Sequence, residues 1–66
     1  MMVDIEDGRG RVLGRVEIYY DTGRNWVARL ASFEKDTTWN VDNGIETDGP
    51  TFQIAFDNLK TKLMIP

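Results

Sequence analysis

The chain contains neither cysteine nor histidine, and these two absences exclude whole classes of chemistry. Without cysteine there is no disulfide and no thiolate nucleophile, and without histidine the usual base near neutral pH is missing. The same absences remove the nitrogen and sulfur ligands of a structural zinc site. The acidic segment over residues 36–48 does not match a calcium-binding EF-hand loop, which needs Gly and Glu where this chain has Val41 and Thr47. We therefore expect no metal, no cofactor and no catalytic residue, and a protein that is not an enzyme.

Long apolar runs and an excess of basic residues are missing as well. No run approaches the ~20 apolar residues of a membrane-spanning helix, and the first residues include acids where a signal peptide carries basic side chains. We therefore expect a cytoplasmic protein with no membrane segment. The net charge of −3 disfavours nucleic acid as a partner, because affinity for phosphates comes from Lys and Arg.

The 66 residues that are present provide one small core. A hydrophobic fraction of 41%, with 2 Trp, 2 Tyr and 3 Phe, argues against intrinsic disorder. A domain of this length has a net stability of only about 3–5 kcal/mol unless something else stabilises it. The sequence therefore predicts a single domain over residues 1–66, for which self-association is one source of added stability.

Short β-rich runs broken by Gly, Asp and Asn recur along the chain, and we find no run of ten or more residues with apolar positions at helical spacing. The clearest unit is a hairpin over residues 11–33 with residues 21–23 at its tip. Loops of two and of three residues compete for this tip, and only the three-residue loop keeps one face apolar along its length. We favour that loop, which sets Ile18 opposite Trp26 and gives Gly23 a positive φ.

The remaining runs extend the same pattern. Further strands are predicted at residues 3–5, 39–41, 45–47, 51–56 and 61–65, with turns at residues 7–10 and 57–60. Several short strands without a helix fit a closed or half-closed barrel, since closure removes the exposed edges of a small sheet. The sequence therefore predicts an all-β fold, either a small five- to six-stranded antiparallel SH3-like barrel or a strongly curved sheet.

The segment from Ile18 to Leu30, IYYDTGRNWVARL, resembles the first hairpin of Tudor-type SH3-like barrels. In that family an aromatic residue, an Asp-Gly turn, a second aromatic residue and an Arg-Ala pair recur in this order. The segment Phe56-Asp57-Asn58-Leu59 is similar to the turn before the last strand of such barrels. The resemblance implies peptide recognition by an aromatic cage, with Tyr20 and Trp26 at the cage positions.

The second face of the main hairpin is too apolar to be left in water, and it combines the apolar, aromatic and Arg side chains that protein interfaces favour. Its candidate binding residues are Leu13, Arg15, Tyr19, Val27, Arg29 and Phe33. In the favoured register Arg15 lies opposite Arg29, which is unfavourable unless Glu17 neutralises them. Two alternatives stay open: the C-terminal half covers this face, or the face binds a second copy or a foreign protein.

A second candidate surface consists of aromatic residues. Tyr20, Trp26 and Trp39 could form a stacking platform, with Trp26 expected inside the fold and Trp39 more exposed. The sequence thus favours a protein-binding or self-associating module. A ligand-binding barrel that recognises a peptide or a sugar through exposed aromatics is the second hypothesis. A nucleic-acid binder that uses an Arg stripe is the third.

Overall fold

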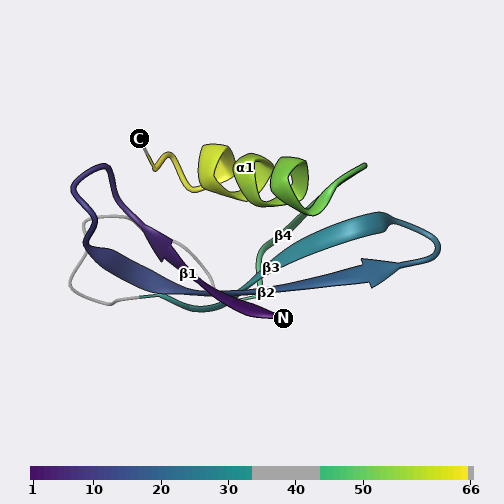
Figure 1. The fold of residues 1–66 in the computed structure, drawn as a ribbon, viewed down its shortest axis with the longest axis horizontal. Coiled ribbons are helices and arrows are strands. Elements are labelled where there is room, and N and C mark those ends of the chain that lie inside the picture. Colours follow the sequence, from purple (N-terminus) through teal and green to yellow (C-terminus); the bar gives the residue numbers. More distant parts are fainter. Residues whose placement is uncertain (34–43, 66) are drawn as a thin grey trace.

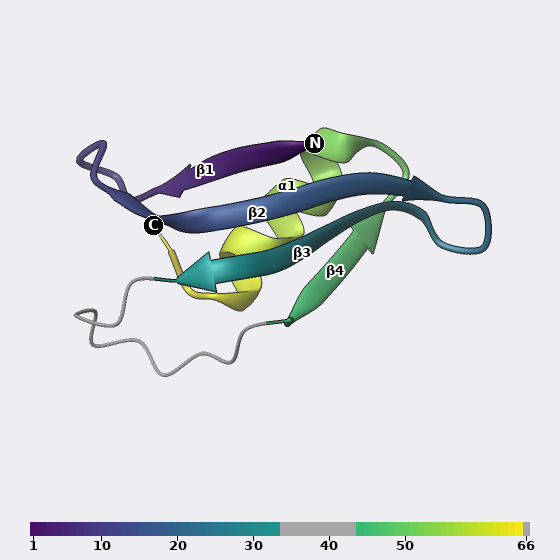
Figure 2. The ribbon, with the colours of Figure 1, turned by 90° about the horizontal axis from the view of Figure 1, so that it is seen from below.

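The computed structural model describes residues 1–33 and 44–65, which form an antiparallel sheet with one helix packed across one face (Figure 1). The strands are β1 (Met2–Glu6), β2 (Val12–Asp21), β3 (Asn25–Phe33) and β4 (Glu46–Gly49), and the helix is α1 (Phe52–Lys62). Their order in the sheet is β1-β2-β3-β4, so each strand pairs with its neighbour in sequence. Figure 2 shows the sheet from the side opposite to α1, which lies behind it.

The sheet of the described residues is open, with β1 and β4 at its two edges. The prediction that strands dominate the fold is confirmed. The predicted barrel of five to six strands is not, because the described residues contain four strands that do not close. The strands expected at residues 51–56 and 61–65 are instead α1 and the residues that follow it. The strand expected at residues 39–41 lies outside the described residues.

The helix begins where the sequence offers a start signal next to Pro50. The Thr51 hydroxyl accepts a hydrogen bond from the backbone N–H of Ile54 at 3.1 Å, which satisfies one of the free donors of the first turn. Ala55, Leu59 and Leu63 follow at intervals of four residues, and all three are buried. This spacing places them on one helix face, so packing against the sheet overrides the strand-like alternation that misled the prediction.

The helix ends in a Schellman motif. The N–H of Ile65 donates to the carbonyl of Lys60 at 3.0 Å, and the N–H of Met64 donates to the carbonyl of Thr61 at 3.0 Å. This closure requires a left-handed residue, and Met64 takes that role with a φ of 61°. Leu63 and Ile65 are both buried, so the motif returns the chain to the sheet.

The main hairpin has the predicted faces but a different register. Ile18 lies opposite Ala28 rather than Trp26, and Tyr20 lies opposite Trp26. From Val16 to Asp21 the shift is two residues, which leaves these side chains on their expected faces. The left-handed residue at the tip is Asn25, with a φ of 69°, and Gly23 does not have the positive φ expected for it.

Two bulges change which side chains face the helix. Leu13 is the extra residue where β2 pairs with β1, and Ala31 is the extra residue where β3 pairs with β2. An inserted residue reverses the alternation of side chains along the strand. Leu13 and Val16 therefore both face the core, although they are three residues apart. At the second bulge the backbones come very close, because a Cβ on Gly14 would lie 2.2 Å from the Ser32 carbonyl oxygen.

The core lies between the sheet and α1. Its buried members are Ile5, Leu13, Val16, Ile18, Ala28, Leu30, Ala55, Leu59, Leu63 and Ile65. Among the described residues no polar or charged side chain is buried. None of the helical residues in this part of the chain forms a helix long and apolar enough to cross a membrane.

Candidate functional site

The six residues of the predicted hairpin interface do not form one surface. Leu13 is buried in the core at 3% exposure, and Phe33 packs against the same core from β3. Arg15, Tyr19 and Arg29 lie on the opposite, outer face, where the charged residues are. Val27, paired with Tyr19, is fully buried and is therefore not available as a contact residue. The separation follows from the bulges at Leu13 and Ala31, which reverse the alternation at one end of the hairpin.

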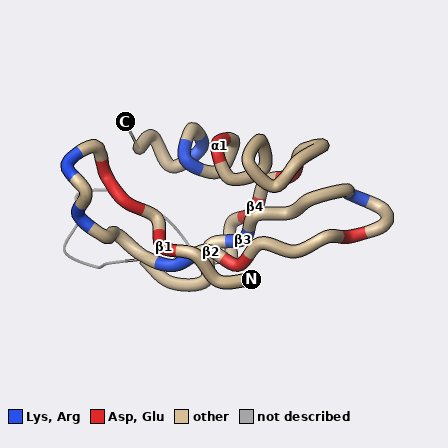
Figure 3. The backbone as a smooth tube through the Cα atoms, viewed as in Figure 1, with Lys and Arg blue, Asp and Glu red and all other residues tan. Residues whose placement is uncertain are grey.

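Figure 3 shows acidic and basic residues on neighbouring strands of the sheet. The Nε atom of Arg15 lies 3.8 Å from a carboxylate oxygen of Asp4. The Nη1 atom of Arg29 lies 3.9 Å from a carboxylate oxygen of Glu17. The expected Arg15–Arg29 pair is wrong, because Arg15 lies opposite Ser32. Each of these two arginines therefore lies near an acid of a neighbouring strand.

A polar cluster joins the tip of the hairpin to β4. Arg24 Nη1 donates to Glu46 Oε1 at 2.8 Å, and Arg24 Nε lies 3.6 Å from Asp48 Oδ2. The Tyr19 hydroxyl donates to the other oxygen of Glu46 at 3.4 Å. The hydrogen bond from Arg24 lowers the pKa of Glu46 below its usual value of 4.5. Glu46 and Asp48 thus link the edge strand β4 to the hairpin.

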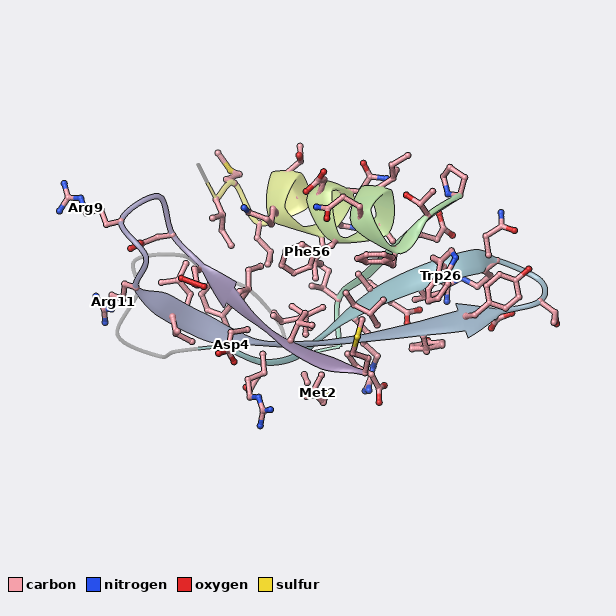
Figure 4. The ribbon with its side chains drawn as sticks, in the orientation of Figure 1. Met2, Asp4, Arg9, Arg11, Trp26 and Phe56 are labelled. Atoms are coloured by element: carbon pink, nitrogen blue, oxygen red, sulfur yellow. The ribbon has the colours of Figure 1, made fainter. Side chains whose placement is uncertain are left out.

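The side chains of Tyr20, Trp26, Phe52 and Ile54 form an apolar group that we call the aromatic cluster. The ring centroids of Tyr20 and Trp26 are 5.6 Å apart, and those of Trp26 and Phe52 are 6.0 Å apart. Both pairs are edge-to-face, the geometry that aromatic rings prefer. Figure 4 shows Trp26 between the first turn of α1 and the tip of the β2–β3 hairpin.

The aromatic cluster is open to solvent on several sides. Tyr20 is 58% exposed, Phe52 is 47% exposed and Ile54 is 43% exposed, whereas Trp26 is half-buried beneath them. Ile54 reaches the cluster over Gly49, the β4 residue paired with Trp26, because a Cβ on Gly49 would lie 2.8 Å from Ile54 Cγ2. The arrangement therefore offers a partner a supported apolar surface.

The sequence predicted only part of this cluster. Tyr20 and Trp26 were expected together and are together, and Trp39 lies outside the described residues. Phe52 and Ile54 were missed because they were assigned to a strand. The four-residue spacing of the buried positions that begin at Ala55, preceded by a capping Thr51, was the signal that could have placed them in a first helical turn.

Two further findings bear on function. Within residues 1–33 and 44–65 there is no group of three or more His, Cys, Asp or Glu side chains placed to hold a metal ion. No family model, no curated protein and no solved structure matches this chain.

Proposed function

We propose that this chain is a non-enzymatic protein-binding module and that the aromatic cluster is its contact surface. The observation that carries the proposal is the exposure of Tyr20 and Phe52, whose rings both pack edge-to-face against Trp26, with Ile54 exposed in the same helical turn as Phe52. Covering a large apolar side chain contributes about 1.5–3 kcal/mol when burial is complete. Aromatic residues are also enriched at the centres of protein interfaces.

The positions of the rings support the same proposal. Tyr20 comes from β2, Trp26 from β3 and Phe52 from α1, so three elements of the fold hold the cluster. The edge-to-face contacts hold the rings against one another without a partner. A surface ordered in advance loses little side-chain entropy on binding, which favours affinity from a small contact area.

The nucleic-acid hypothesis fits the surface less well, whereas the ligand hypothesis uses the same surface. An Arg-based nucleic-acid site would need unpaired positive charge, whereas Arg15, Arg24 and Arg29 each lie within 4 Å of a carboxylate oxygen. A sugar or peptide ligand would use the same rings as a protein partner. We therefore propose a partner that inserts an aliphatic or aromatic side chain against the cluster.

Selection from a library of random displayed peptides tests this proposal. Peptides enriched on the wild-type chain are expected to lose binding to a Tyr20→Ser/Phe52→Ser variant, as measured by titration with tryptophan fluorescence. Met64→Ser is the matched control, because Met64 is an 81% exposed apolar residue outside the cluster. Enriched peptides that bind both variants equally well would show that the cluster is not the contact surface.

A further inference from the structure

The strand β1 has backbone hydrogen-bonding groups that no described strand uses. Met1 and Ile18 exchange two backbone hydrogen bonds, from Ile18 N to Met1 O at 2.7 Å and from Met1 N to Ile18 O at 2.9 Å. Such pairs alternate along an antiparallel ladder, so the groups of Val3 face β2 and those of Met2 and Asp4 face away from it. Since β1 is the first strand in the sheet order, Met2 and Asp4 present these groups at a free edge.

The opposite edge of the sheet is more protected than β1, which carries only its acids and a bulge. At β4 the side-chain amide of Asn58 donates to the carbonyl of Asp48 at 3.0 Å, and Pro50 follows the strand directly. The strand β1 contains neither proline nor lysine, which are the usual devices against edge pairing. The bulge between Ile5 and Glu6 interrupts the regular pairing of β1, so only residues 2–5 form a regular edge.

The charges of β1 select a register for pairing with a second copy. Two identical antiparallel strands meet around a twofold axis, and either Val3 or Asp4 can lie on that axis if the outward groups are used. With Asp4 on the axis, like charges lie directly opposite each other, which is destabilising. With Val3 on the axis, Met2 lies opposite Asp4 of the second copy and no like charges are opposed.

The apolar side chains favour the same register. Figure 4 shows Met2 and Asp4 projecting from β1 on the side of the sheet away from α1. Val3 and Ile5 lie on the side of α1, where they face the core. With Val3 on the axis, the two Val3 side chains meet each other. Met1, which is 65% exposed, then lies opposite Ile5 of the second copy. The apolar face of one sheet would then continue into the next.

From this edge we propose that two copies of the chain associate by antiparallel pairing of their β1 strands, with Val3 on the twofold axis. Met2 and Asp4 of each copy exchange backbone hydrogen bonds with Asp4 and Met2 of the other. The contact extends the sheet across both copies and covers the exposed side chains of Met1 and Met2. It uses β1 rather than the aromatic cluster and therefore does not depend on the proposed function.

Cross-linking through introduced cysteines tests the register directly, because the chain has no cysteine of its own. Val3→Cys places the two thiols across the axis, so disulfide-linked dimer is expected to form at least about tenfold faster than from Thr22→Cys, an exposed position at the hairpin tip. The proposal is overturned if Val3→Cys reacts no faster than Thr22→Cys.

Removal of one backbone donor provides an independent test without a cysteine. Asp4→Pro eliminates the outward N–H but no hydrogen bond to β2, and Asp4→Ala is the matched control that loses the carboxylate and keeps the N–H. Sedimentation equilibrium is expected to give a dimer dissociation constant at least about tenfold larger for Asp4→Pro than for Asp4→Ala. Equal constants, or a wild-type chain that stays monomeric at every concentration reached, would overturn the proposal. Circular dichroism confirms that both variants are folded.

Discussion

At the scale of single residues, the tip of the β2–β3 hairpin depends on Asn25 rather than on Gly23. Asn25 has a φ of 69°, a region that asparagine tolerates and β-branched residues do not. Asn25→Val is therefore expected to reduce the free energy of unfolding by about 1–2 kcal/mol. Gly23→Ala is expected to change it by less than about 0.5 kcal/mol, because its Cβ would make only an ordinary contact with Asp21. Urea denaturation of the two variants checks the contrast, and a reversed order would contradict this description of the turn.

Met64 is the second described non-glycine residue with a positive φ, and its side chain, unlike that of asparagine, is unsuited to it. Its φ of 61° closes the helix C-terminus, where glycine is the residue that natural helices prefer. Because Met64 is 81% exposed, little packing is lost when its side chain is removed. Met64→Gly is expected to raise the free energy of unfolding by about 0.5–1 kcal/mol. Met64→Ala, which keeps the strain, is the control, and the two variants are compared in urea.

The same residues show what sequence reasoning could and could not reach. Alternation assigned Val16, Ile18 and Leu30 to one face, and all three are buried there. The position of the left-handed residue was not predictable from Asp21-Thr22-Gly23 alone, because Asn25 can adopt the same conformation two residues later. A shift of two residues keeps every face unchanged, so the apolar pattern gives no means of choosing between these registers.

At the scale of secondary structure elements, α1 depends on its first turn. The Thr51 hydroxyl receives the Ile54 N–H at 3.1 Å, and the first turn of the helix contains no acidic residue. Thr51→Ala is expected to lower the free energy of unfolding by about 0.5–2 kcal/mol, since it removes the capping oxygen. Thr51→Ser retains that oxygen and is expected to restore most of the stability. Equal losses for both variants in urea denaturation would show that the cap contributes little.

The edge strand β4 should give the protein a dependence on pH through Glu46. The hydrogen bond from Arg24 lowers the pKa of Glu46, so the folded state binds this proton less readily than the unfolded chain does. The resulting stability is present above the usual pKa of 4.5 and is lost as the pH falls through the lowered pKa. Glu46→Gln is expected to be less stable than the wild type at pH 7, with the difference narrowing in acid.

Asp7 is a second acid whose pKa is lowered in the folded state, so it serves as the internal control for this experiment. The backbone N–H groups of Arg9 and Arg11 donate to the carboxylate of Asp7 at 2.8 Å and 3.0 Å and lower its pKa as well. Asp7 remains in both proteins, so the difference between wild type and Glu46→Gln isolates Glu46. A difference that stays constant from pH 7 to acid would contradict the proposed role of the Arg24 hydrogen bond.

The elements also explain why the helix and the bulges escaped prediction. Phe52, Ile54 and Phe56 alternate as a strand would, while the positions spaced by four from Ala55 follow a helical period. Both periods coexist in this short segment. Whether it forms a strand or a helix depends on which side chains the sheet can cover. The bulges at Leu13 and Ala31 depend on contacts between strands, which no local pattern encodes. The aromatic cluster was therefore only half predictable, because Phe52 and Ile54 belong to the missed helix.

At the scale of the whole molecule, the described residues form one thin core between the sheet and α1, and this core supports the fold. Leu59 is fully buried at its centre, and its truncation to alanine is expected to cost about 2–5 kcal/mol. A domain of this size has about 3–5 kcal/mol in total, so Leu59→Ala should be largely or wholly unfolded at 25 °C by circular dichroism. Met64→Ala should remain folded, because Met64 lies in solvent and outside this core. If β1 pairing joins two copies, raising the protein concentration should partly refold Leu59→Ala, since only the folded chain presents a paired edge.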